Sequence, residues 1–219
     1  MVKIQIPFGL GLKVITPRAK IESELARACA TQMNARMKGV DIQVRELVEE
    51  KLEELIRGSS TYDALMNGQL RTELGLADPS GAMDQIIQAV KAGVKITRTR
   101  FTVRARSFSG GFKIVALPSS YVDLISLDLA SYVSENGHQV PWLRWLLLEG
   151  RAPVVMEHRI QFNRPRKSRT DDAIMHFYGS GAWAVPAEHA GDAEQNFITE
   201  GLDTLKDPIS GVIMKGLSG

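Results

Sequence analysis

The chain has 219 residues, of which 44% are hydrophobic and 24% are charged, and its formal net charge is +2. These values suit one sizeable globular domain with a buried core, and the near-neutral total argues against a protein whose whole task is bulk neutralisation of nucleic acid. Local basic stripes remain open. The single cysteine, Cys29, excludes an internal disulfide and fits a reducing cytosolic origin.

Residues 1–16 are expected to form an extended arm, because Ile4 and Ile6 alternate with polar neighbours. The apolar run around them is short, is broken by Pro7 and lacks a small-residue cleavage site, so no secretory signal is expected. No apolar run in the sequence approaches the roughly 20 residues that span a bilayer, so we expect no membrane segment.

Residues 17–93 are expected to be helical. Thr16 and Pro17 have the character of an N-cap followed by proline at the first helical position. Apolar residues then recur at helical spacing. Gly39 either ends this first helix or kinks one long helix that continues to about Ile56.

A connector with short helical turns is expected over residues 58–81, where Gly68, Gly75 and an Asp-Pro pair interrupt the pattern. It leads into the last helix of this region. Ser80 is expected to cap that helix and Gly93 to close it.

From Val94 the hydrophobic period changes to two, which predicts a strand. Residues 109–111, Ser-Gly-Gly, have the composition of a hairpin turn, so a returning strand is expected over residues 112–117. A helix is then expected from residue 119 or 120 to Gly137.

The segment "VPWLRWLLLEGRAPVVMEHRIQF" combines a short apolar helix, ended by Gly150, with a strand over residues 154–162. A polar loop leads to another strand region over residues 173–186, broken by a turn at residues 179–181. A short helix is expected to end near Leu205, and residues 207–219 are expected to be only partly ordered.

This order of elements predicts an α+β fold, in which N-terminal helices precede a small antiparallel sheet with inserted helices. The expected organisation is an arm over residues 1–16, one domain over residues 17–206 and a tail over residues 207–219. Within that domain, residues 17–93 are helical and residues 94–206 contain the sheet.

No motif in the sequence carries recognisable catalytic or metal chemistry. The four histidines lack zinc-binding spacing, and no phosphate-binding or nucleophile motif occurs, so no cofactor and no metal are expected. A hydrolase would have to use His158 with Asp171 or Asp172. On its apolar strand face, His158 is better interpreted as a structural histidine, and two adjacent carboxylates rarely converge on a metal.

The most unusual charge pattern is a strand with Arg98, Arg100, Arg104 and Arg106, which alternation predicts to share one face. Such a face is a solvated surface paired with acidic neighbours, a surface lining a channel for nucleic acid, or an intersubunit strip of ion pairs. No aromatic residue interleaves it, so base stacking is not expected there.

The short helix around Trp142, Trp145 and Leu146 is apolar nearly all round. The first interpretation is domain core. Because one inward stripe needs fewer apolar residues, the second interpretation is that a neighbouring subunit covers part of it. We therefore expect one tryptophan in the core and the other near a subunit boundary.

Four segments in this order resemble the head–tail joining, neck or tail-completion proteins of long-tailed bacteriophages. They are the connector "STYDALMNGQLRTELGL", the helix "WLRWLLLEG", the polar loop "SRTDDAIM" and the terminal stretch "WAVPAEHAGDAEQNFITEGLDTL". The resemblance covers residues 58–206. At residues 170–172 the chain has Thr-Asp-Asp where a small-residue or glycine-rich loop is expected.

The resemblance implies a non-enzymatic virion protein that forms a homo-oligomeric ring around the DNA channel, between portal-side and tail proteins. It implies assembly in the host cytoplasm and no membrane contact. The arm, through Ile4 and Ile6, would add to a neighbouring subunit by strand pairing. The alternative is a cytosolic nucleic-acid-binding module that uses the Arg98–Arg106 face.

Overall fold

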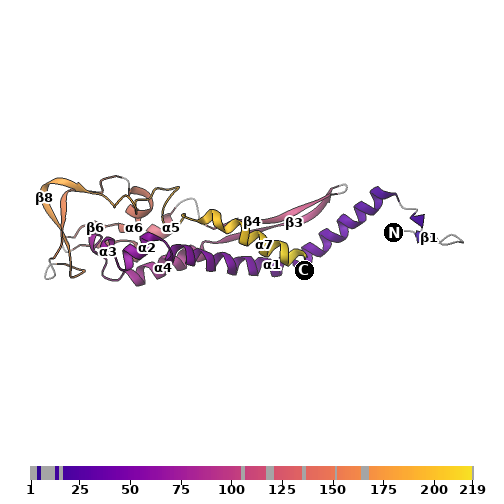
Figure 1. Ribbon diagram of the computed structural model, residues 1–219, viewed down its shortest axis with the longest axis horizontal. Helices are drawn as coiled ribbons and strands as arrows, with labels where there is room; N and C mark the ends of the chain where they lie inside the picture. The colour runs from indigo at the N-terminus through magenta and orange to yellow at the C-terminus, as the bar shows by residue number, and fades with distance from the viewer. Residues whose placement is uncertain are drawn as a thin grey trace. The chain divides into compact units, whose positions relative to one another are not determined.

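The structure, a computed structural model, describes residues 4–5, 13–14, 17–104, 107–116, 121–134, 137–150, 152–163 and 168–218 (Figure 1). Helices come first and short antiparallel strand pairs follow with further helices, so the predicted α+β class is confirmed. The strands form four separate two-stranded sheets in the described part of the chain, in place of the one small sheet that was expected.

The chain divides into two compact units. Unit 1 comprises residues 1–47, 95–115 and 207–219, and unit 2 comprises residues 48–94 and 116–206. Unit 1 contains strands β1 (Ile4–Gln5), β2 (Lys13–Val14), β3 (Lys95–Arg104) and β4 (Ser107–Val115), the first part of helix α1 (Arg18–Arg57), and nearly all of helix α7 (Lys206–Ser218).

Unit 2 begins with the end of α1 and contains short helices and two strand pairs. Its helices are α2 (Ser60–Met66), α3 (Gln69–Glu73), α4 (Pro79–Ala92), α5 (Val122–Ile125), the 3-10 helices η1 (Asp128–Ala130) and η4 (Leu202–Leu205), α6 (Trp142–Arg144) and the π-helix η2 (Trp145–Glu149). Its strands are β5 (Tyr132–Val133), β6 (Gln139–Val140), β7 (Val155–Gln161) and β8 (Ile174–Trp183).

Helix α1 is continuous through Gly39, so the interpretation as one long helix is the correct one. It begins at Arg18, and the carbonyl of Pro17 accepts hydrogen bonds from Lys20 and Ile21. One stripe of buried side chains runs along it at helical spacing: Ala26, Ala30, Met37, Val40, Val44, Val48, Leu52 and Ile56. Gly39 is exposed, and no atom of the described residues lies within 4 Å of the position that a Cβ would take there, so it lowers helix propensity without ending the stripe.

The connector forms the two short helices α2 and α3, as expected, and Gly93 closes α4 as predicted. The predicted cap is wrong by two residues. Asp78, not Ser80, accepts a hydrogen bond from the Gly81 N–H, and Pro79 occupies the first helical position.

Three predicted boundaries after residue 94 are wrong. Gly110 and Gly111 lie within β4, not in a turn, and Arg104 of β3 pairs with Ser107 of β4. The helix expected to reach Gly137 is only one turn long, because Tyr132 and Val133 pair with β6. Strand β8 runs through Gly179 and Gly181 with positive φ and a register shift, without a turn that ends it.

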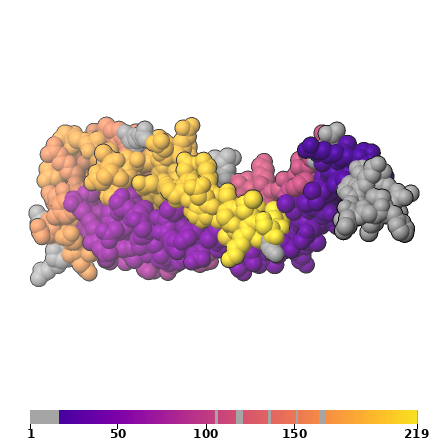
Figure 2. Space-filling view, turned by 45° about the vertical axis from the view of Figure 1, so that its right-hand side comes forward, coloured from indigo at the N-terminus to yellow at the C-terminus, as the bar shows by residue number. Residues whose placement is uncertain are grey.

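The C-terminal residues form a regular helix, so the expectation of a partly ordered tail is wrong. In α7 the residues Ile209, Val212, Ile213, Gly216 and Leu217 recur at helical spacing, and Leu217 is buried. Its carbonyl accepts a hydrogen bond from Arg36 of α1 at 3.1 Å. In Figure 2 the yellow C-terminal segment lies directly against the indigo-to-purple residues of α1.

Residues 192–205 form turns followed by η4, where a short helix was expected. The apolar side chains of this segment nevertheless point inward. Phe197, Ile198 and Leu205 are buried, and Leu202 is half-buried. The buried Asn196 amide donates to the Tyr121 hydroxyl at 3.0 Å, which gives this irregular segment a specific anchor.

Candidate functional site

The predicted arginine face does not exist as one surface. Arg98 pairs with Phe112 in the β3–β4 hairpin, and Arg104 pairs with Ser107. The register shifts by one residue between Thr99 and Thr102, where β3 carries one residue more than β4. Because strand side chains alternate between faces, this bulge places Arg98 and Arg104 on opposite faces of the hairpin.

The bulge is fixed by one side chain of α1. The Asn34 amide donates to the Phe101 carbonyl at 2.9 Å, and its oxygen accepts from the Phe101 N–H at 2.8 Å. Opposite it lies Gly110, where a Cβ would stand 2.6 Å from the Cα of Phe101. The predicted turn glycine is therefore required by close approach of the two strands.

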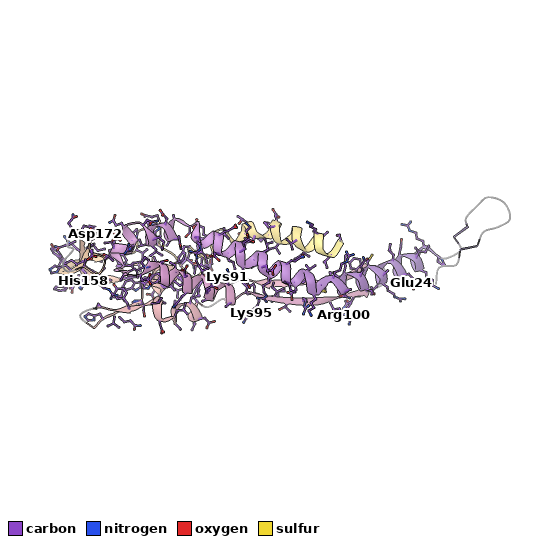
Figure 3. All side chains as sticks on the ribbon, turned by 90° about the horizontal axis from the view of Figure 1, so that it is seen from below. Glu24, Lys91, Lys95, Arg100, His158 and Asp172 are labelled. Carbon is purple, nitrogen blue, oxygen red and sulfur yellow. The ribbon has the colours of Figure 1, made fainter. Side chains whose placement is uncertain are left out.

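Arg98 and Arg100 lie on the face directed at α1. Together with Thr31, Asn34, Ala35 and Met37 they line an open hollow, and Figure 3 shows Arg100 on the hairpin alongside α1. The Arg98 Nε lies 3.7 Å from Asp41 Oδ2, while Asp41 Oδ1 is buried and has no hydrogen-bond partner among the described residues. Arg104 is exposed on the other face, and Arg106 lies outside the described residues.

The two units differ sharply in charge. Unit 1 has fifteen lysines and arginines against five aspartates and glutamates, a formal charge of +10. Unit 2 has twelve against twenty, a formal charge of −8. Residues 95–115 alone contain six basic residues and no acidic one. The near-neutral total thus conceals a basic unit and an acidic unit.

The apolar helix around Trp142 is core. Trp142 and Leu146 are 1% and 0% exposed within the chain, and the Trp142 indole donates to the Leu129 carbonyl at 2.8 Å. The interpretation of these two residues as subunit contacts is therefore wrong for this structure. Trp145 is half-buried, and its ring centroid lies 5.9 Å from that of Trp183. Trp142 and Trp145 are therefore unequally buried, as predicted.

The arm residues Ile4 and Ile6 were also named as subunit contacts. For Ile4 only the backbone is described, and it pairs with Val14. Ile6 lies outside the described residues. The strand pairing of the arm with a neighbouring subunit stays a prediction.

The residues that a hydrolase would use, His158 with Asp171 or Asp172, all belong to unit 2. His158 is half-buried, its Nδ1 lies 2.7 Å from the Met156 carbonyl oxygen, and its ring meets Phe177 edge-on. Asp171 and Asp172 are exposed, and among the described residues no hydrogen bond links either to His158. Figure 3 labels His158 and Asp172.

A charged network in unit 2 has a stabilising role. Glu53 of α1 accepts hydrogen bonds from Lys91 at 2.8 Å and from Arg57 at 2.9 Å, and Arg57 also bonds Asp84 and the Tyr62 hydroxyl. The bonds from Lys91, and next from Arg57, lower the pKa of Glu53 below its ordinary value. This network joins α1, α2 and α4 of unit 2.

Among the described residues, no group of His, Cys, Asp or Glu is arranged to hold a metal ion. Within the same residues, none of the helices combines the length and apolarity needed to cross a bilayer. No family model, curated protein or solved structure matches the chain.

The division of charge was missed by sequence reasoning. Unit 1 is assembled from three separate stretches of the chain, and no contiguous window reveals its charge. The available signal was the run from residue 95 to 115, where six basic residues occur without a carboxylate. The bulge had a weaker signal, a Gly-Gly pair that also suits a turn.

Proposed function

We propose that the chain is a structural virion protein of a tailed phage. It forms a homo-oligomeric ring in the neck, at the head–tail connector, tail-completion or tail-terminator position, around the path of the DNA. Its partners are neighbouring copies, portal-side proteins and tail proteins. It acts without catalysis.

The observation that carries the proposal is the division of charge between the two units. A basic surface attracts the phosphates of DNA that passes through a ring, and an acidic surface elsewhere can pair with basic surfaces of other proteins. Unit 1, with a formal charge of +10, supplies the basic surface, and unit 2, with a formal charge of −8, supplies the acidic one.

Apolar exposure in unit 1 supports contacts with neighbouring chains. Leu25, Ile42 and Met214 are 63%, 54% and 64% exposed. The apolar residues of the hairpin are only half-buried: Ile96, Phe101, Val103, Phe108, Phe112, Ile114 and Val115. Such surfaces are typical of chains that are completed by an interface.

Native mass spectrometry and negative-stain imaging of the purified protein, alone and with portal-side and tail proteins, test the proposal. Rings, formed alone or on a partner, are the expected result. A strictly monomeric protein that never associates with virion particles would contradict it.

The same charge division favours a second candidate, a cytosolic nucleic-acid-binding module. This candidate predicts binding to DNA without rings and without virion association. Particle purification followed by mass spectrometry of the components separates the two: presence in the virion at a ring-like stoichiometry excludes the module.

A further inference from the structure

The β3–β4 hairpin has two chemically different faces. The face toward α1 carries the exposed Arg98 and Arg100 and a set of half-buried apolar residues: Ile96, Val103, Phe108, Phe112 and Ile114. On the opposite face it places Lys95, Thr97, Thr99, Thr102, Arg104 and Lys113, all exposed. We name the second set of six residues the outer face.

All six residues of the outer face carry a hydroxyl or a cation, and the half-buried Val115 and Gly111 lie on the same side of the hairpin. Ser107 and Ser109 extend its row of hydroxyls and are also exposed. Among the residues that the structure describes, Lys95, Arg104 and Lys113 form no ion pair. A surface of threonine, serine, lysine and arginine side chains has the chemistry that contacts phosphate oxygens in nucleic acids.

We propose that the outer face binds the sugar–phosphate backbone of duplex DNA without reading its sequence. The inference rests on the proposed function for the source of the DNA, and on the hairpin alone for the chemistry.

The composition favours a phosphate backbone over a protein partner or single-stranded bases. A stable protein interface has an apolar and aromatic centre, which this face lacks. Single-stranded binding uses aromatic stacking platforms, and both phenylalanines of β4 lie on the face toward α1. Phosphate oxygens need only the donors and cations that the outer face presents.

The dimensions also fit a duplex. Strand β3 has ten residues, which at about 3.3 Å per residue extend roughly 30 Å. One turn of duplex DNA is about 34 Å long, so the hairpin runs along most of one turn. Three cations per chain give an expected slope of log affinity against log salt of about −2.7, and several hairpins in one ring would add avidity.

The test is fluorescence anisotropy of a labelled DNA duplex with the full chain over a range of salt concentrations. The variant R104E/K113E reverses two cations of the outer face. We expect its affinity to fall about tenfold or more and the salt slope to shrink by about 2. The control R144E/K206E makes the same change of charge on exposed residues of unit 2 and should leave affinity nearly unchanged.

A second variant removes hydroxyls and keeps the charge. T97V/T99V/T102V replaces threonines with a residue of similar shape and high strand propensity, so the hairpin should be retained. We expect binding to weaken several-fold with an unchanged salt slope. Circular dichroism checks the fold of both variants.

Three outcomes would overturn the inference: equal loss in R104E/K113E and R144E/K206E, no loss in R104E/K113E, or disassembly of rings by R104E/K113E with unchanged DNA affinity. The last would assign the face to acidic residues of a second copy. Ring formation is measured separately by native mass spectrometry. Loss of DNA binding with intact rings supports both proposals, and loss of DNA binding in a protein that never forms rings supports only this one.

Discussion

Unit 1 and unit 2 are stabilised in different ways. Unit 2 buries large side chains such as Trp142, Leu52 and Ile87 completely, and it satisfies its buried Asn196 amide with specific partners. Unit 1 buries mainly small or slender side chains along α1 and leaves its hairpin half-exposed. Unit 2 therefore has a core of large, fully buried side chains, which the hairpin of unit 1 lacks, although both units expose large apolar side chains such as Leu25 in unit 1 and Phe177 in unit 2.

The largest expected difference between the units is the cost of removing a leucine side chain. Leu146→Ala in unit 2 should lower the free energy of unfolding by about 2–5 kcal/mol, because it leaves a cavity in a packed core. Leu25→Ala in unit 1 should change it by less than about 0.5 kcal/mol in an isolated chain, because Leu25 is 63% exposed. Chemical denaturation measures both, and similar losses would contradict the comparison.

The next largest effect on stability is expected where α7 packs against α1. A Cβ at Gly216 would lie 2.5 Å from Val40 Cγ2, so Gly216→Val should destabilise unit 1 by about 1–3 kcal/mol through overpacking. Gly211→Ala is the control, because its Cβ would have no atom within 4 Å. Faster amide hydrogen exchange across α7 in Gly216→Val alone is the expected result. Unchanged exchange would show that this helix does not depend on the close approach.

A smaller effect on stability is expected at the bulge of β3, which Asn34 holds in place. Asn34→Ala removes both side-chain hydrogen bonds to Phe101 and should cost about 1–2 kcal/mol. Gln32→Ala, on an exposed position two residues away, is the control. Hydrogen exchange of the Phe101 amide should accelerate in Asn34→Ala only, and protection retained in that variant would argue against the role of Asn34.

The smallest effect concerns the pH dependence of unit 2. Because hydrogen bonds hold the pKa of Glu53 below 4.5, its ionised form stabilises the fold above the unfolded-state pKa, and this contribution is lost as pH falls through the lower folded-state pKa. Glu53→Gln should therefore lower the melting temperature at neutral pH, and the difference from the original chain should shrink below about pH 4.5. A constant difference across this range would exclude the carboxylate as its cause.

The sequence was informative where a periodic pattern met a consistent end signal. Both signals occur in three places: along α1, at the end of α4 beside Gly93, and around Trp142. The structure has helices in all three. The tail was misjudged because the helical spacing of Ile209, Val212, Ile213 and Leu217 was not taken into account. Pro208 is tolerated there because it lies in the first turn of α7.

The candidate site was harder to predict, because it depends on one extra residue in a strand. Period-two alternation from Arg98 to Arg104 fails at the bulge, and the bulge depends on Asn34, more than 60 residues earlier in the sequence. The burial of Trp142 and Leu146 within their own chain likewise depends on elements distant in sequence. Local patterns identify apolar side chains but not what covers them.

The central claim, that unit 1 faces DNA in an assembled ring, is tested most directly by mapping protein–DNA cross-links in purified particles. Formaldehyde cross-linking followed by peptide mass spectrometry compares lysines of the two units in one experiment. We expect adducts at Lys95 and Lys113 of the hairpin and few at Lys51 or Lys206 of unit 2. Cross-links concentrated on unit 2, with the hairpin lysines unmodified, would contradict the account.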